Sequence, residues 1–517
     1  MSLNRRAFLG GALRASALTL VPGFLSACAH QGAPLLPTAV ATAHGGSSWF
    51  HSHFGIDDAL LQRVMSRALA RGGDFCDLYF EHSLSNSIRL EDGQINTART
   101  NVELGCGVRV VQGIRFGYAF TEELTPEGLL KAADAAAAIA TGAPGAVAAS
   151  LRLRTTANLY PIKTPWDNLG IEERMPLLSR VNEQIASLDK RIVKSTVSLA
   201  DGAKRILVVT SDGSMHEDFQ PMAMLGAGAV AEQNGRRERS SFASGGRVGL
   251  EYFDAGLQDR VARETVNRTV ELFEAVTPPA GEYPLVLGPG PSGILLHEAI
   301  GHGIEADFNR KNISVFANKL GKKIAIPEIT VVDSGLHPHT RGAINIDDEG
   351  QAAQETVLVE KGVLNSYLHD RISAAWYKVP STGSGRRESF HFPPMPRMRN
   401  TYMLPGSESP QDILASVKRG IYAESFTNGQ VKIGEGSFSF YIAKGRLIED
   451  GKLTAPIKDV NIIGNGPEVL SRITRVGNDL KIDEGGWTCG KDGQSVPVSQ
   501  GMPTALVSSI TIGGSRG

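Results

Sequence analysis

A short segment near the middle of the chain carries two histidines and a carboxylate at a spacing that suggests metal chemistry. It reads Gly293-Ile-Leu-Leu-His297-Glu298-Ala-Ile-Gly301-His302-Gly303. In the metal-binding pattern H-E-x-x-H the histidines are four residues apart and share one helix face, whereas here they are five apart. At 3.6 residues per turn, a step of five rotates about 500° and leaves the second ring about 140° away from the first. A regular α-helix therefore cannot present both imidazoles to one ion.

The glycines on either side of His302 could change the helix so that both rings face the same side. Gly301 and Gly303 allow the helix to end or bulge there, which would bring the His302 ring back beside His297. Two histidines near a carboxylate can equally be a hydrogen-bonded core pair, so a third ligand is needed to decide. A catalytic zinc site uses three protein ligands and one open position. The spacing alone does not choose among three candidates for the third ligand, which are Glu305, Asp307 and the distant Cys489.

The segment just before these histidines matches a second motif. Gly288-Pro289-Gly290-Pro291-Ser292-Gly293 fits G-x-G-x-x-G, which would point to a nicotinamide-dependent oxidoreductase. That motif requires a βαβ unit of about 30 residues, but the polar stretch 305–311 stands where the second strand should lie. The two prolines also remove amide donors. We therefore expect an ordinary turn from a strand into a helix.

The elements around the histidine segment predict an α+β fold. Apolar spacing indicates helices over 56–71, 126–140 and 255–276, and alternation indicates strands over the ranges given below. Residues 277–281 (Thr-Pro-Pro-Ala-Gly) break the last of these helices. We expect a mixed α/β N-terminal domain (55–277) and a β-dominated C-terminal domain (281–517) that carries a short metal-binding helix. The expected strands are 76–82, 87–90, 94–97, 108–111, 114–120, 192–200, 206–210, 222–231 and 283–287.

The first residues are predicted to be an export signal. Arg5-Arg6 precede an apolar stretch interrupted by Arg14, which is typical of a twin-arginine signal peptide over residues 1–27. Leu25-Ser-Ala-Cys28 is similar to a lipobox, so a lipidated Cys28 could tether the protein to a membrane; cleavage nearby without lipidation is the alternative. Residues 28–54 would form a flexible tether. The expected location is the periplasm, either free or as a membrane-anchored lipoprotein.

Composition excludes several classes of protein. The chain has 517 residues, 53 Lys and Arg against 54 Asp and Glu, and 41% hydrophobic residues, which is typical of a globular protein that does not bind nucleic acid. Four cysteines are too few for a disulfide scaffold. We expect Cys76 and Cys106 to be buried thiols, with a disulfide between them the lesser alternative. The basic segment 385–399 is interpreted as a solvated or interface loop, with an arginine clamp on a peptide carboxylate as the lesser alternative.

The histidine segment, extended to Asp307, resembles the HExxxH motif of the TldD/PmbA family of zinc metalloproteases. The resemblance covers the C-terminal domain almost end to end and the N-terminal domain more loosely from Ile56. TldE/PmbA-like partner subunits lack the metal motif, so this chain resembles the TldD side. The other similar segments are Asn312 to Gly321, Asn345 to Gly350, Tyr367 to Arg371, Gly385 to Ser389, Pro394 to Arg397, Asn400 to Met403 and Cys489 to Gln494.

The resemblance implies a zinc peptidase acting on short or unfolded peptides. His297, His302 and Cys489 would hold Zn²⁺, and Glu298 would activate a zinc-bound water. Glu305 and Asp307 would then orient His302 or cap backbone groups rather than bind the metal.

The resemblance also implies partners. The subunit would be a homodimer or a heterodimer with a TldE/PmbA-like subunit, and extended peptides would add to a sheet edge. The export signal departs from familiar cytosolic members of the family. The alternative function is a non-hydrolytic peptide-binding or peptide-maturation subunit with a structural metal site.

Overall fold

The computed structural model describes residues 48–148 and 150–514. Every described residue belongs to one compact unit. The predicted export signal, Cys28 and most of the predicted tether lie outside the described residues. The last six tether residues form helix α1 (Trp49–Phe54), in which Phe50 is fully buried, so they belong to the folded unit. Within the described part, no helix is long and apolar enough to cross a membrane.

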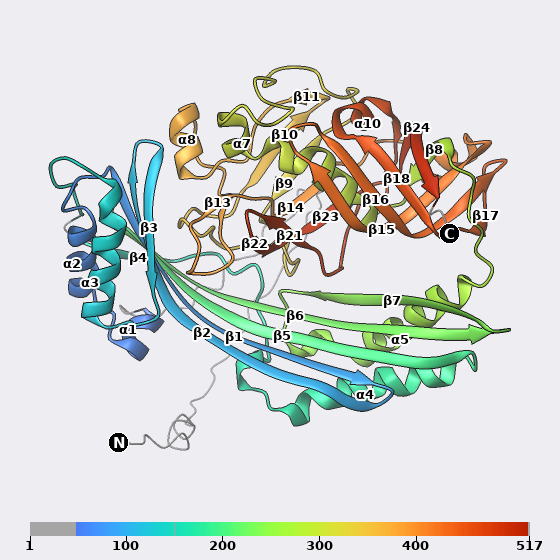
Figure 1. The fold of residues 1–517 in the computed structure, drawn as a ribbon, viewed down its shortest axis with the longest axis horizontal. Coiled ribbons are helices and arrows are strands. Elements are labelled where there is room, and N and C mark those ends of the chain that lie inside the picture. Colours follow the sequence, from blue (N-terminus) through green and yellow to red (C-terminus); the bar gives the residue numbers. More distant parts are fainter. Residues whose placement is uncertain (1–47, 149, 515–517) are drawn as a thin grey trace, which may run out of the picture. The chain divides into compact units, whose positions relative to one another are not determined.

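The N-terminal half of this unit is built on one long, curved sheet of seven strands (Figure 1). The strand order is β3-β2-β1-β5-β6-β4, and β7 pairs with the remaining part of β6. All pairs are antiparallel except β4 with β6. The strands are β1 (Phe75–Glu91), β2 (Gln94–Gln112), β3 (Arg115–Thr121), β4 (Arg152–Arg154), β5 (Ile192–Thr210), β6 (Ser214–Gln233) and β7 (Arg236–Gly246).

These strands are longer than the sequence pattern predicts. The separate strands expected over 76–82 and 87–90 are one strand, β1, and those expected over 192–200 and 206–210 are one strand, β5. Between the two ranges expected for β1, the strand continues and pairs with both β2 and β5. Two neighbouring strands satisfy the backbone groups of these residues, so a polar stretch does not end the ladder.

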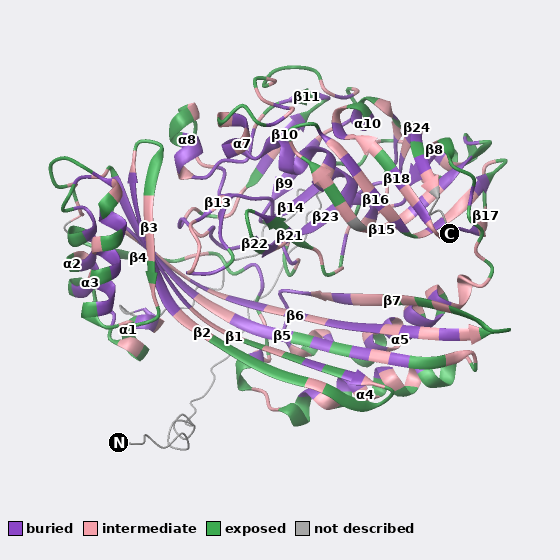
Figure 2. Ribbon diagram, in the orientation of Figure 1, coloured by how far each residue is buried: buried purple, intermediate pink, exposed green. Residues whose placement is uncertain are grey.

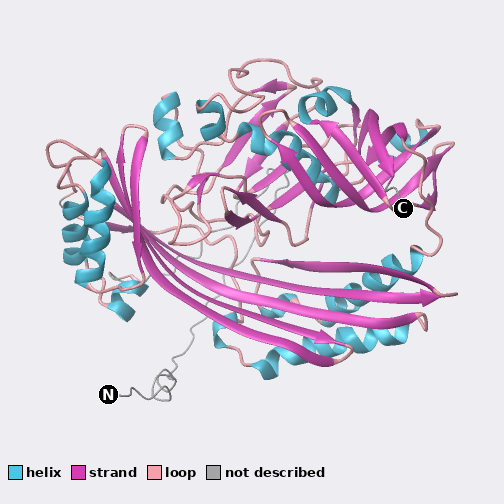
Figure 3. Ribbon diagram, in the orientation of Figure 1, coloured by secondary structure: helices cyan, strands magenta, loops and turns pink. Residues whose placement is uncertain are grey.

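Two layers of helices cover this sheet at different places (Figures 1 and 3). Helices α2 (Asp58–Ala68) and α3 (Pro126–Ala136) pack near the β1–β2–β3 end. Helices α4 (Ile171–Leu188) and α5 (Ala255–Glu271) pack against β5, β6 and β7. Each pair encloses its own apolar core. Burial alternates along part of β5 (195–201), whereas residues 75–81 of β1 are all buried (Figure 2). Helix α5 ends five residues earlier than expected.

The C-terminal half contains a closed ring of five strands. The pairing runs β15-β8-β24-β18-β16, and β16 pairs back to β15. The largest apolar core of the described residues lies among these strands and the histidine segment. The ring strands are β8 (Gly281–Leu287), β15 (Arg419–Lys432), β16 (Ser437–Glu449), β18 (Val460–Asn465) and β24 (Ala505–Gly514); β17 (Lys452–Pro456) pairs with β16 and β19 (Ile473–Val476) with β24.

A second sheet and two hairpins complete this half. The six-stranded sheet has the order β11-β10-β9-β14-β23-β20, and β12–β13 and β21–β22 form the hairpins. Short helices fill the connections. The α+β prediction, with a mixed N-terminal part followed by a β-dominated part, is confirmed. The remaining elements are β9 (Val331–Ser334), β10 (Glu355–Glu360), β11 (Val363–Leu364), β12 (Gly385–Arg386), β13 (Met395–Pro396), β14 (Asn400–Met403), β20 (Lys481–Ile482), β21 (Thr488–Lys491), β22 (Gln494–Pro497), β23 (Ser499–Met502), α7 (Ala306–Arg310), α8 (Arg371–Tyr377), α9 (Pro410–Ala415) and α10 (Gly466–Arg472).

Candidate metal centre

The histidine segment is a π-helical turn. Helix α6 (Ile294–Leu296) leads into a π-helix over His297–Gly301, followed by a 3₁₀ turn over His302–Ile304. The His302 backbone N–H donates to the His297 carbonyl, five residues back. This wider turn stacks residues five apart above one another, and the two ring centroids lie 5.0 Å apart at 88°. The predicted bulge that brings His302 beside His297 is confirmed.

The two glycines serve this turn in a different way from the one expected. Gly301 has ordinary helical angles, φ −51° and ψ −59°, so backbone freedom is not what the turn requires of it. A Cβ on Gly301 would collide with the Met398 sulfur, and one on Gly303 would collide with the Phe316 ring. The missing side chains therefore let the π-turn pack tightly against its neighbours.

Cys489 reaches the two histidines from the β21–β22 hairpin. Its Sγ lies 3.5 Å from His302 Nε2, and ligand atoms of Cys489, His297 and His302 all lie within 4.8 Å of one another. Three donors at about 2.0 to 2.3 Å from one tetrahedral zinc would stand about 3.3 to 3.7 Å apart. All three side chains are buried. This group of two imidazoles and one thiol therefore fits a zinc ion, and the structure brings Cys489 rather than Glu305 or Asp307 into the third position.

The two histidines favour the ionised form of the Cys489 thiol. Burial opposes ionisation of Cys489, but the adjoining His302 and His297 rings outweigh it and hold the pKa of this thiol well below its usual value. A metal requires the thiolate form of cysteine. The His297 Nδ1 atom is buried and has no hydrogen-bond partner among the described residues. A buried polar atom without a partner is costly in free energy. The unpaired nitrogen is therefore consistent with a site that binds a ligand.

A carboxylate behind His302 fixes its ring. Glu305 Oε2 lies 3.1 Å from His302 Nδ1, which leaves Nε2 to face Cys489. Lys491 Nζ lies 3.1 Å from the same Glu305 oxygen and 2.8 Å from Asp307 Oδ1. Although burial opposes ionisation, Lys491 and His302 lower the pKa of Glu305 to about 2. Glu305 thus orients His302, as expected, whereas Asp307 is held by Lys491.

Lys491 is a site residue that sequence reasoning missed. The sequence does contain an indication of Lys491, because alternate residues of a strand point to the same side. Cys489 and Lys491 are two apart on β21, so a strand that delivers the thiol also delivers the ammonium.

A cavity of about 510 Å³ opens over the metal group. Its wall includes His297, His302, Cys489 and the half-buried Glu298. The other side of the cavity is lined by Gly429, Gln430 and Val431 of β15. Glu298 therefore faces the same space as the three donors, where a water or a bound chain could reach both.

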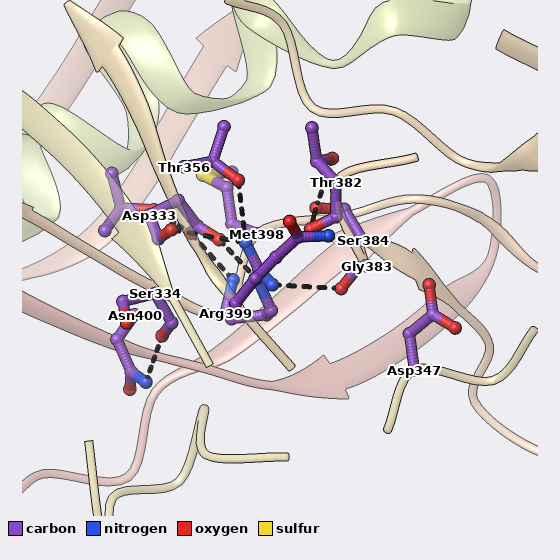
Figure 4. A network of polar contacts seen from close by, with 12 residues as sticks. Asp333, Ser334, Asp347, Thr356, Thr382, Gly383, Ser384, Met398, Arg399 and Asn400 are labelled. Carbon is purple, nitrogen blue, oxygen red and sulfur yellow. Dashed lines mark hydrogen bonds and ion pairs between the residues drawn. The ribbon is translucent and has the colours of Figure 1, made fainter. Parts of the chain in front are cut away.

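The arginines of the basic segment 385–399 are not solvated, so the first of the two interpretations from sequence, a solvated loop, is wrong. Arg386, Arg387, Arg397 and Arg399 are at most 4% exposed. Arg399 donates to Asp333 Oδ1 (2.7 Å) and to the Gly383 carbonyl (3.0 Å) (Figure 4). Buried guanidinium groups are tolerated when carboxylates and carbonyls accept their protons, and a linear sequence does not show those acceptors.

This buried network also supports the π-turn. Figure 4 shows Asp333 and Thr356 converging on Arg399, with Met398 beside them. Met398 is the residue that packs on Gly301. Nearby, Arg397 donates to the Cys489 carbonyl. The segment 397–399 therefore contacts both parts of the metal group.

Two other expectations concern segments away from the metal. The glycine-rich segment forms a turn into the 3₁₀ helix Pro291–Gly293, and β8 has its parallel neighbour at β15, far along the chain, so no compact βαβ unit exists there. Cys76 and Cys106 are free and buried. On the β1–β2 ladder Cys76 pairs with Val110 and Cys106 with Phe80, so four residues separate them along the strands and no disulfide forms.

Comparisons with known proteins show the family of this chain. Three family models match: PmbA/TldA metallopeptidase domain 1 over residues 76–140, the central domain over 164–273, and the C-terminal domain over 280–514. A metalloprotease TldD homolog of Haemophilus influenzae is 40% identical over 453 residues, which cover 86% of this chain and 94% of that protein. The chain belongs to the TldD/PmbA metallopeptidase family. Homologues named metalloproteases indicate that a metal acts in this family.

Solved structures support the fold. A Thermotoga maritima crystal structure, described as that of a modulator of DNA gyrase, aligns with TM-score 0.69 at 22% identity, covering 85% of this chain and 96% of that one. TldE from Thermococcus kodakarensis aligns with TM-score 0.67 at 20% identity, covering 88% and 99%. At these identities the likeness concerns the architecture alone.

Proposed function

We propose that this protein is an exported zinc-dependent peptidase that hydrolyses short or unfolded peptides. The observation that carries the proposal is the meeting of His297, His302 and Cys489 on one wall of a cavity that Glu298 also lines. When bound, zinc would supply a Lewis acid that polarises a peptide carbonyl and lowers the pKa of a water molecule.

The chain's own residues would move the protons. His297, His302 and Cys489 would hold the ion, and Glu305 would keep the His302 ring in place. Glu298 would accept a proton from the attacking water and then donate it to the leaving amine. The position of Glu298 on the cavity wall, directly after the first histidine, supports this role.

The edge of β15 would hold the substrate. β8 pairs with β15 only at Ile421, Tyr422 and Ala423. Beyond that point the described pairing of β15 is with β16, on its other side, and residues 429–431 line the cavity. An extended peptide could add there as a strand, binding mainly through backbone groups with little sequence preference. Folded proteins would not offer such a strand.

The proposal extends to location and partners. The paired arginines and the lipobox-like segment at the start of the sequence support twin-arginine export, with Cys28 as a lipid anchor. The likeness to TldE supports a partner of the same fold, which would be a second copy of this chain or a TldE-like subunit.

Metal analysis combined with a peptide-cleavage assay tests the function. We expect about one zinc per wild-type chain, and cleavage of unstructured peptides. Glu298→Gln should keep the zinc and lose at least about 100-fold in kcat, the size expected for a general acid–base group. His297→Ala and Cys489→Ser should lose the zinc as well. Asp492→Asn, which changes another carboxylate lining the same cavity, serves as the matched control and should keep both.

The same experiment separates the alternative function. A wild-type chain that holds zinc but cleaves no peptide, alone or with a TldE-like subunit, would contradict the peptidase proposal. That result would favour the non-hydrolytic peptide-binding or peptide-maturation subunit with a structural metal.

A further inference from the structure

Three buried arginines near the hairpin of Cys489 have no carboxylate partner. Arg247, Arg341 and Arg386 are 3%, 9% and 4% exposed, yet none of them takes part in an ion pair among the described residues. Arg386 donates to the Met398 and Pro497 carbonyls (2.6 and 2.8 Å). Buried charges are normally paired, because removal from water is costly. This group therefore differs from Arg399, which has Asp333.

Arg247 is the least satisfied of the three. Its only side-chain hydrogen bond in the described structure is a 3.5 Å contact with Gln220, and its Nε is buried without a partner. Its guanidinium stacks over the Tyr160 ring at 5.1 Å. Burial lowers the pKa of both Arg341 and Arg386 to about 10; Arg247 adds repulsion to each, while Asp483 and Asp348 act in the opposite direction. Arg247 is thus close enough to Arg341 and Arg386 to disfavour their charged forms.

Arg247 and Arg386 line a cavity of about 140 Å³, which is separate from the one over the metal group. Lys204 and Arg387 add two more cations to its wall. The carboxylates on the wall already accept backbone hydrogen bonds: Asp347 from Glu349, Gln351 and Gly385, Asp348 from Arg387, and Glu388 from Ser495. Lys204 already pairs with Glu81 and Arg387 with Asp77. Within the described part of the chain, Arg247 is therefore the wall cation that lacks a carboxylate and has an N–H without an acceptor.

We propose that this cavity is a binding site for a small oxyanion, of the carboxylate or phosphate class, held by Arg247, Arg386 and Lys204. A planar guanidinium with an unused N–H suits such a ligand, because it can donate to oxygen atoms in a fixed geometry. The volume admits one such group and excludes a nucleotide. The anion would come either from free solution or from an acidic end of a bound peptide.

The site connects to the metal group through its arginines. Arg341 donates to the Trp487 carbonyl and to Thr488 Oγ1, both of which line the metal cavity. On its other side it contacts the sulfur of Met222, which lines the anion cavity. Arg386 donates to Pro497, which pairs with Thr488 in the β21–β22 hairpin. An anion here would contact the residues that position the strand of Cys489.

Thermal denaturation and calorimetric titration of the purified full chain test the proposal. Inorganic phosphate is added up to about 10 mM, with chloride keeping the ionic strength constant. We expect a saturable rise in Tm and a measurable Kd for the wild type. Arg247→Gln should weaken binding at least tenfold, and Arg247→Lys, which keeps the charge, should weaken it less. Arg237→Gln removes an exposed arginine that pairs with Glu232 and should leave binding unchanged.

Further titrations identify the source of the anion. Two peptides of one sequence, with a free or an amidated C-terminus, are compared in wild type and Arg247→Gln. A free-acid preference that Arg247→Gln removes assigns the site to a substrate carboxylate, and phosphate binding without such a preference assigns it to a free anion. The proposal is wrong if neither phosphate nor the free acid binds the wild type, or if Arg247→Gln and Arg247→Lys both bind like the wild type. Because these are binding measurements, they do not depend on peptidase activity.

Discussion

Replacing Glu305 with glutamine should weaken metal binding without emptying the site. The substitution keeps the size of the side chain and removes its charge. In the protein the Glu305 carboxylate contacts His302 Nδ1 and Lys491 Nζ, each at 3.1 Å, and is fully buried. The carboxylate therefore fixes the His302 ring and increases the electron density of the nitrogen that faces Cys489.

The size of the effect follows from this position. Carboxylates that hydrogen-bond a metal-ligating histidine typically contribute 10- to 100-fold to metal affinity, which corresponds to about 1.4 to 2.7 kcal/mol. We expect Glu305→Gln to fall in this range in a competition titration against a chromophoric zinc chelator. Its peptidase activity should be restored in part by added zinc, because all three ligands remain.

A matched control separates orientation from general damage. Asp307→Asn also removes a buried carboxylate from Lys491 (2.8 Å), but in the described structure Asp307 makes no contact with His302. Both variants should lower the free energy of unfolding, and only Glu305→Gln should lower the zinc affinity. If Glu305→Gln binds zinc within threefold of the wild type, or if Asp307→Asn weakens zinc equally, the role assigned to Glu305 is wrong.

Three further predictions concern stability. Gly301→Ala should cost about 1 to 3 kcal/mol of folding free energy and lower the zinc content, because its Cβ would collide with Met398; Gly490→Ala, with nothing within 4 Å of its Cβ, is the control in urea denaturation and metal analysis. Asp333→Asn should cost about 3 to 5 kcal/mol in the same denaturation assay, because it leaves the fully buried Arg399 without its counter-charge; a loss below about 1 kcal/mol would contradict this. Burial lowers the pKa of His369 to about 4, so between about pH 6.5 and pH 4 the unfolded chain binds a proton that the native protein does not, and stability should fall by up to about 3 kcal/mol as the pH falls through this window. His369→Gln should flatten that part of the stability profile against pH, and an unchanged acid slope would show that other groups cause it.

Local patterns were sufficient to predict many of the elements. The caps of α2 and α3 are visible in the sequence, since Asp57 and Thr125 accept the bonds expected of N-cap residues. The turn at Asp92-Gly93 follows from residues that adopt positive φ. Strand lengths were not predictable in this way. The polar residues between the two predicted parts of β1 end a strand only if no neighbour pairs with them, and that depends on β2 and β5.

For the candidate metal centre, the sequence shows the types and the spacing of the possible ligands, and the fold determines which of them meet. The residue types and the five-residue spacing indicate that the helix must end or bulge between His297 and His302 if both are to bind one ion, because no regular α-helical turn brings residues five apart together. The sequence did not determine the third ligand in the same way. Glu305, Asp307 and Cys489 were equally open from spacing, and only the packing of the β21–β22 hairpin over the π-turn places the Cys489 sulfur beside the rings. The surroundings of the arginines are likewise decided by the fold, because only tertiary contacts bring a charge or a cavity next to each of them. Arg399 has Asp333 as its counter-charge. Arg247 instead lies beside a cavity and has an N–H without an acceptor among the described residues.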